Sequence, residues 1–230
     1  MQNPEKVALF DFCETLVKFQ TADRYVLYVC NSIDSKGINR KAKLYNWCRN
    51  TGLIGVVSHL FPYASINKRF VLWRLKGADE AVMDNLAEQY YEKQIRPNFI
   101  RESVSELVSL KESGYRIIIL SGGYDIYLRY FADEYGISDV ISSSIAFRNN
   151  RCTGLLNGPD CLWGNKIMML ESYCKAKHIE IDKGGSIAFS DSESDLPMLK
   201  YVSNRVIVHR LGSRRWYDRK DYTREITWDN

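Results

Sequence analysis

The chain has 230 residues, more than one average domain and less than two, and its hydrophobic fraction of 45% is ample for a packed interior. Its net charge of +4 is too mild to indicate a nucleic-acid-binding protein. The longest near-apolar run is about half of what a membrane span needs, the polar N-terminus lacks the apolar stretch of a signal peptide, and the six cysteines form no Cys-x-x-Cys pair. We therefore expect a cytoplasmic protein with reduced, mostly buried thiols and with neither a nucleic-acid nor a membrane partner.

Short apolar runs recur along the chain and predict buried parallel strands. In chain order they cover residues 7–10, 117–120, 140–141, 186–189 and 206–208. Amphipathic helical patterns lie between them, at 99–112, 124–135 and 166–177. Strands that alternate with helices in this way predict an α/β fold, with a Rossmann-like parallel sheet core and helices on both faces.

Two stretches depart from this alternation. Residues 18–96 lack clean strand runs, are rich in aromatic side chains that we interpret as core, and show helical patterns at 21–33, 64–76 and 79–94. They predict an inserted all-helical cap domain, which leaves 1–17 and 97–230 as a discontinuous core domain. A turn signal at Asn149-Asn150 between two weak strand patterns predicts a small hairpin near 145–158.

Four polar segments lie where predicted strands end or helices begin, and ligands bind at the carboxyl ends of parallel strands. Asp11 follows the first strand and offers a carboxylate nucleophile for phosphorus. Asp191 follows another strand and can join Asp11 in holding Mg²⁺, a hard cation that prefers oxygen ligands. Asp195, one helical turn further on, is a candidate either for a metal-bound water or for pairing with Lys166.

The phosphate itself needs donors and a positive charge. Ser121 and the backbone N–H groups of Gly122 and Gly123 offer donors near a predicted helix start, and Lys166 brings a fixed cation. An aspartate that ends a strand is often only a helix cap, and Ser-Gly-Gly is often only a turn. The four segments together, in this order, favour phosphoryl transfer.

These segments resemble the motifs of the haloacid dehalogenase superfamily, in the branch typified by phosphoserine phosphatase. Residues 11–16 resemble the first motif, Asp-x-Asp-Gly-Thr-Leu, residues 120–123 the second, Lys166 the third and residues 191–199 the fourth. The resemblance implies an enzyme, a phosphatase, with an aspartyl-phosphate intermediate and a helical cap. It implies the following roles: Asp11 as nucleophile; Asp11, the backbone carbonyl of Cys13 and Asp191 as Mg²⁺ ligands; Ser121, Gly122 and Lys166 on the phosphate; Thr15 and Asp195 in support.

Cys13 departs from that pattern, because the family has there a second aspartate that protonates the leaving alcohol and then activates water. Glu14 also departs, since glycine is usual at its position. General acid–base catalysis is worth roughly 10²–10⁴-fold, so the departure bears on turnover. Three interpretations stay open: Glu14 replaces the missing carboxylate, Cys13 acts as a weak acid, or the reaction needs no acid from the protein.

The sequence therefore predicts an Mg²⁺-dependent phosphomonoesterase for a small phosphorylated metabolite. A phosphotransferase to an alcohol acceptor and a non-hydrolytic phosphate-binding protein are the alternatives. Two basic stretches are open to two interpretations, solvated surface or contact with anions. They are Lys36, Arg40, Lys41 and Lys43 in the predicted cap, and Arg210, Arg214, Arg215, Arg219 and Lys220 around Trp216 near the C-terminus.

Overall fold

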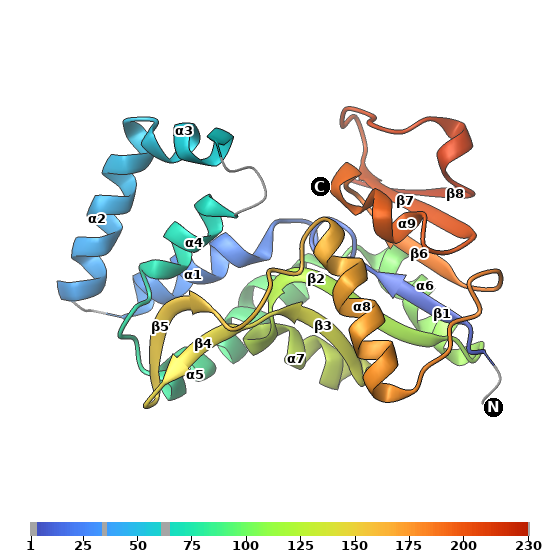
Figure 1. The fold of residues 1–230 in the computed structure, drawn as a ribbon, viewed down its shortest axis with the longest axis horizontal. Helices are drawn as coiled ribbons and strands as arrows, with labels where there is room; N and C mark the ends of the chain where they lie inside the picture. The colour runs from blue at the N-terminus through green and yellow to red at the C-terminus, as the bar shows by residue number, and fades with distance from the viewer. Residues whose placement is uncertain (1–3, 34–35, 61–64, 230) are drawn as a thin grey trace.

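The computed structural model describes residues 4–33, 36–60 and 65–229. Its centre is a six-stranded sheet with the order β3-β2-β1-β6-β7-β8, in which every neighbouring pair is parallel. The strands are β1 (Val7–Phe10), β2 (Arg116–Tyr124), β3 (Asp139–Ser143), β6 (Ile187–Ser190), β7 (Asn204–Arg210) and β8 (Arg224–Trp228). Figure 1 shows the sheet with helices in front of it and behind it.

The two faces of the sheet are covered by different helices. Ala8 and Phe10 pack on the face that α6 (Arg101–Glu112) and α7 (Asp125–Tyr135) cover. Val7 and Leu9 point to the other face, which α8 (Gly164–Lys177) and α9 (Leu196–Leu199) cover. Since successive strand residues alternate between faces, all four residues of β1 are buried. The expected Rossmann-like α/β core is confirmed.

The strand order brings two predicted site residues together. From β1 the chain first builds β2 and β3 on one side and then β6, β7 and β8 on the other. The order therefore reverses between the neighbours β1 and β6, where Phe10 pairs with Phe189. Ligands of open α/β sheets bind at such a switch point. Asp11 and Asp191 follow β1 and β6 directly, so both lie there.

The described part of residues 18–96 contains helices and no strand of either sheet. They are α1 (Thr21–Ser32), α2 (Lys36–Asn50), α3 (Leu53–Leu60), α4 (Ile66–Trp73) and α5 (Glu80–Tyr90), followed by a wide turn, Tyr91–Ile95. The sequence patterns did not indicate α2 and α3. Residue 64, where the second predicted segment begins, lies outside the described residues. Figure 1 shows α2 and α3 at the end of the molecule away from β7 and β8.

Tyrosines attach this helical region to the core. Tyr25 of α1 and Tyr90 of α5 are buried, and their rings lie 5.2 Å and 5.5 Å from the ring of Tyr127 on α7. Their hydroxyls donate to the backbone oxygens of Met83 and Thr21. The interpretation of the aromatic residues as core is confirmed for Phe19, Tyr25, Tyr90 and Tyr91, whereas Trp47 and Phe70 are exposed. Two others, Phe61 and Tyr63, lie outside the described residues. The division into a cap at 18–96 and a core at 1–17 and 97–230 stays a prediction.

The expected hairpin is present as β4 (Ile145–Arg148) and β5 (Arg151–Leu156). Asn149 and Asn150 have φ of 50° and 58°, a left-handed pair that suits a two-residue hairpin turn. Backbone bonds from Gly77 N to Cys152 O and from Cys152 N to Ala78 O tie β5 to the segment after α4. The hairpin thus packs against the helical region.

One expectation about the sheet was wrong, and one strand was missed. Ser121, Gly122 and Gly123 were expected after the strand, near a helix start, but β2 continues to Tyr124 with an irregular register between Ser121 and Tyr124. Glycines, which lack Cβ, accommodate such a bulge. Strand β8 was not predicted, because its residues alternate between exposed and buried and form an edge of the sheet. No described helix is both long and apolar enough to span a membrane.

Candidate active site

Asp11 and Lys166 form the centre of the site. Lys166 Nζ lies 2.7 Å from Asp11 Oδ1 and 2.7 Å from Asp195 Oδ2, and its side chain is 2% exposed. Although burial opposes it, attraction to the two carboxylates raises the pKa of Lys166 above its ordinary value. Helix α8 carries Lys166 over the switch point, so one buried cation joins segments from the beginning and the end of the chain. The sequence left two roles open for Asp195, a metal-bound water or pairing with Lys166, and the structure shows the pairing with Lys166.

The carboxylates outnumber this cation. Burial is the main cause that raises the pKa of Asp11 to about 6, against the attraction of Lys166. Burial and the nearby charges of Asp11, Glu14 and Asp195 raise the pKa of Asp191 well above its ordinary value. One oxygen of Asp195, Oδ1, is buried with no hydrogen-bond partner. The site therefore carries more buried negative charge than Lys166 neutralises.

Thr15 and Trp216 hold the loop that carries Asp191. The hydroxyl of Thr15 lies 3.4 Å from Asp11 Oδ2 and 3.2 Å from Asp191 Oδ1, and it accepts the N–H of Asp191. The indole of Trp216 donates to the backbone oxygen of Asp191 at 2.7 Å. Trp216 was expected only as a packed surface residue. An indole N–H needs a partner when buried, but nothing in the sequence shows which partner it finds.

Cys13 lies in the site as a buried thiol. Its Sγ is 3.1 Å from the hydroxyl of Thr21 and accepts the N–H of the same residue at 3.4 Å. Burial and the charge of Asp11 raise the pKa of Cys13 to about 12. The thiol therefore keeps its proton at neutral pH. All six cysteines are free and buried, in agreement with the expectation of reduced thiols.

Glu14 does not face the same space. Its carboxylate accepts a hydrogen bond from the amide of Gln20 at 2.6 Å. It lines a separate cavity of about 140 Å³ beside Asp191 and Trp216. Its backbone has φ of 55°, a left-handed conformation that favours glycine. The backbone at Glu14 thus has the conformation that suits the glycine usual at this position of the family's first motif. The Glu14 side chain does not line the cavity that contains Asp11 and Lys166.

The Ser-Gly-Gly segment lies across the cavity from Asp191. The Gly123 N–H donates to Ser121 Oγ at 2.9 Å, so the Ser121 hydroxyl accepts within its own segment and its proton is available to another group. A Cβ on Gly122 would lie 2.4 Å from Leu162. Gly122 therefore keeps this wall of the cavity open.

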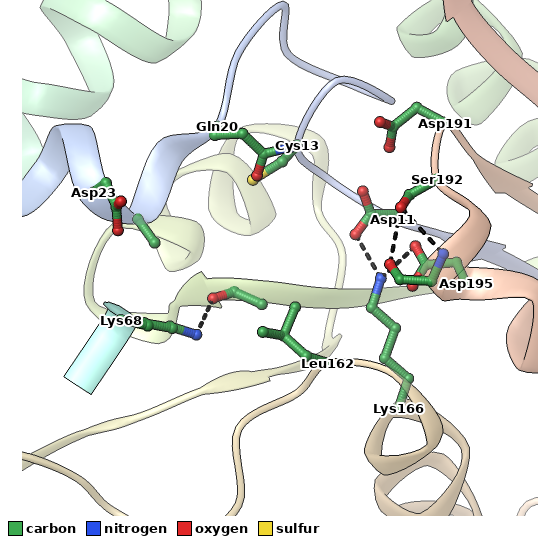
Figure 2. A pocket seen from close by; sticks show the side chains of 13 residues that line it. Asp11, Cys13, Gln20, Asp23, Lys68, Leu162, Lys166, Asp191, Ser192 and Asp195 are labelled. Carbon is green, nitrogen blue, oxygen red and sulfur yellow. Dashed lines mark hydrogen bonds and ion pairs between the residues drawn. The ribbon is translucent and has the colours of Figure 1, made fainter. Parts of the chain in front are cut away.

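Most of the predicted site residues share one cavity of about 240 Å³, shown in Figure 2, but Ser121 and Glu14 do not line it. Asp11, Cys13, Gly122, Lys166, Asp191 and Asp195 line it. Sequence reasoning missed Gln20, Asp23, Lys68 and Leu162, which also line it. The basic residues proposed for guiding substrates, Lys36, Arg40, Lys41 and Lys43, do not line it; the cation that reaches it from the helical region is Lys68. Its position inside a helix next to Arg69 gives no sequence signal for this role.

The site offers oxygen donors to a divalent cation. Among the described residues, no three His, Cys, Asp or Glu side chains converge in a way that would by itself hold a metal ion. The predicted ligands are only two such side chains, Asp11 and Asp191, with a backbone carbonyl. A hard divalent cation binds oxygen ligands, and its charge would neutralise the buried carboxylates that Lys166 leaves uncompensated. The residues present therefore fit Mg²⁺.

Comparison with known proteins agrees with this arrangement. The family model described as haloacid dehalogenase-like hydrolase matches residues 8–200. A phosphoserine phosphatase of Methanocaldococcus jannaschii is 24% identical over 207 residues, which cover 90% of this chain and 86% of the relative.

Two solved structures share the fold. A protein of unknown function from Bordetella pertussis Tohama I has a TM-score of 0.74 at 17% identity, covering 90% of this chain and 91% of its own. A phosphoserine phosphatase in its apo form has a TM-score of 0.63 at 18% identity, covering 96% and 93%. The expected class of enzyme, a phosphatase, is confirmed at this level. The chain belongs to the haloacid dehalogenase-like hydrolase family, in its phosphoserine-phosphatase-like branch.

Proposed function

We propose that this phosphatase hydrolyses a phosphate monoester of a small metabolite through an aspartyl-phosphate on Asp11, with Mg²⁺ as cofactor. The observation that carries the proposal is the buried carboxylate of Asp11 at the switch point, 2.7 Å from the Lys166 ammonium and inside a cavity with surplus acid. A cavity of about 240 Å³ supports a small substrate. The free, buried cysteines support a cytoplasmic location.

The reaction has two displacements. A carboxylate oxygen of Asp11 attacks phosphorus, the bond from phosphorus to the ester oxygen breaks, and the departing alcohol oxygen takes up a proton. Water then cleaves the aspartyl-phosphate, which releases inorganic phosphate and restores Asp11. Lys166, the Ser121 hydroxyl and the Gly122 N–H would hold the phosphate oxygens in both displacements.

Asp11, Asp191 and the backbone carbonyl of Cys13 would hold the Mg²⁺, while Asp195 would support the site by positioning Lys166. When bound, Mg²⁺ would neutralise phosphate charge and orient the group for attack. The raised pKa values of Asp11 and Asp191, caused first by burial and then by neighbouring carboxylates, support this set, because a divalent cation would stabilise both charged carboxylates.

The proton for the leaving alcohol is the open part of the mechanism. Cys13 lines the cavity and Glu14 does not, which favours Cys13 over Glu14 as the acid. A thiol with a pKa of about 12 holds a proton to give but is too rarely deprotonated to activate water. Slow cleavage of the aspartyl-phosphate is the expected consequence. Slow cleavage is also compatible with the two alternative functions, transfer of the phosphoryl group to an alcohol acceptor and binding without turnover.

The test is a phosphate-release screen of the purified protein over a panel of small phosphate esters, with Mg²⁺ and with EDTA. Asp11→Asn is the matched control, since it keeps the shape of the side chain and removes the nucleophile. Release that requires both Asp11 and Mg²⁺ is the expected result. Phosphorylation of added glycerol would identify a phosphotransferase. Release that survives in Asp11→Asn would show that the proposed nucleophile is wrong.

A further inference from the structure

The end of the cavity away from the phosphate site is formed by Gln20, Asp23, Lys68 and Leu162, here called the alcohol subsite. Figure 2 shows Asp23 and Lys68 on the opposite side of the cavity from Asp191, Asp195 and Lys166. A phosphate held by Lys166 would direct the alcohol part of its ester toward this subsite. The chemistry of the subsite therefore selects the substrate.

Lys68 and Lys166 are the only cations among the described residues that line the cavity. The three donors of the Lys68 ammonium are all taken. One goes to Gly122 O at 2.5 Å, one to Ser143 Oγ at 2.9 Å and one to the carboxylate of Asp160. Lys68 is therefore neutralised and ties α4 to the core, and it has no donor left for an anionic group of a substrate.

The network around Asp160 fixes this pairing. Asp160 is 5% exposed, and the Ser143 hydroxyl donates to it at 2.5 Å. The amide of Asn165 donates to the Asp160 backbone oxygen at 3.0 Å. Since the counter-ion and its neighbours are held in place, Lys68 cannot turn to a ligand without leaving a buried carboxylate unpaired.

The remaining groups of the subsite carry no free positive charge. The Gln20 amide donates one of its two N–H groups to Glu14 at 2.6 Å, which leaves one neutral N–H donor and the carbonyl oxygen for a ligand. Asp23 presents a carboxylate whose nearest donor, the Asn67 amide, lies at 3.4 Å. Asp23 is an exposed residue, and partial desolvation raises its pKa against the attraction of Lys68 and the bond from Asn67. Leu162 adds an apolar wall.

We propose that the substrate of this site is a phosphate ester whose alcohol part carries hydroxyl or ammonium donors and no carboxylate, with Asp23 as its acceptor. The inference rests on the proposed function and makes its substrate class more specific. A carboxylate in the alcohol subsite would meet the like charge of Asp23 and a Lys68 that is already paired with Asp160, so it would be repelled without gaining a free cation. The relatives are named for phosphoserine, which bears such a carboxylate; this chain is thus expected to disfavour it.

The experiment uses two pairs of esters that differ in a carboxylate: phosphoethanolamine with O-phosphoserine, and glycerol 3-phosphate with 3-phosphoglycerate. For the wild-type protein with Mg²⁺ we expect kcat/KM of each carboxylate-free ester to exceed that of its partner by about tenfold or more. Equal or faster turnover of either carboxylate ester would overturn the proposal.

Variants locate the cause. Asp160→Asn removes the counter-charge of Lys68 while an acceptor oxygen remains, so the carboxylate esters should gain at least about threefold relative to their partners. Asp23→Asn should lower turnover of phosphoethanolamine if the donor is an ammonium, and turnover of glycerol 3-phosphate if it is a hydroxyl. Asp133→Asn, at an exposed position of α7, is the matched control and should change no ratio. If the ratio of kcat/KM between the esters of each pair is unchanged in both Asp160→Asn and Asp23→Asn, these residues do not select the substrate and the proposal is overturned.

Failure of the proposed function gives a different result. If the protein releases phosphate neither from these esters nor from p-nitrophenyl phosphate, hydrolysis is refuted. Calorimetric binding of the four esters then tests the subsite directly. Tighter binding of each carboxylate-free ester would support the inference, and equal or absent binding would overturn it.

Discussion

Asp11→Asn should make the protein more stable at neutral pH while it removes activity. In the folded chain the pKa of Asp11 is raised from 3.8 to about 6, mainly by burial. A group whose folded pKa is raised contributes stability that is fully present below its unfolded pKa and is lost as the pH rises through its folded pKa. At pH 7.5 the charged carboxylate therefore lowers the free energy of unfolding, and a neutral side chain of the same shape does not.

The shift of about 2 pKa units corresponds to about 3 kcal/mol, at 1.36 kcal/mol per unit. For a chain of this size that is about 6–12 °C in Tm. At pH 4.5 the difference between the two proteins should fall to about 1 kcal/mol, because most of the native Asp11 is then protonated. Urea unfolding of both proteins in EDTA at the two pH values measures these differences.

Asp139→Asn is the opposite control. Asp139 is buried, accepts two bonds from Arg116 at 2.9 Å and 3.0 Å, and accepts the Tyr173 hydroxyl at 2.7 Å. Although burial opposes it, these bonds hold the pKa of Asp139 below its ordinary value. Its loss should destabilise the protein at pH 7.5, by about 1–2 kcal/mol. If Asp11→Asn is also less stable than the wild type there, attraction to Lys166 outweighs burial and the surplus-charge argument is refuted.

Three further variants test separate parts of the site. Lys166→Met leaves buried carboxylates without their cation, so it should cost about 3–5 kcal/mol in urea unfolding and about 10²–10³-fold in phosphate release; a near-neutral effect on both would contradict the role given to this cation. Cys13→Asp should raise phosphate release by about 10²–10⁴-fold if the missing carboxylate limits turnover, whereas a lower rate would show that the thiol suits the chemistry of this enzyme. Trp216→Phe removes the bond to the Asp191 backbone, worth about 1 kcal/mol, and should lower phosphate release about fivefold, compared with Trp47→Phe on the exposed face of α2 as control.

The apolar runs were sufficient to predict five of the six strands of the central sheet. A parallel strand buried on both faces has to be apolar at nearly every position, and β1 with all four residues buried is such a strand. Edge strands do not follow this rule: β8 alternates exposed and buried residues and therefore forms no continuous apolar run. Helices α2 and α3 were missed for a similar reason, because few of the described residues in α2 are buried and the pattern is weak.

The same contrast holds for the site. The sequence by itself determined which residues follow the central strands, because Asp11 and Asp191 directly continue apolar runs and a parallel sheet brings such ends to one edge. Only the tertiary structure decided what surrounds them. Lys68 contacts groups 54 to 92 positions away, and Trp216 reaches back 25 positions to Asp191. No local pattern encodes such contacts, since each depends on where helices and loops pack rather than on the neighbours of a residue in the chain.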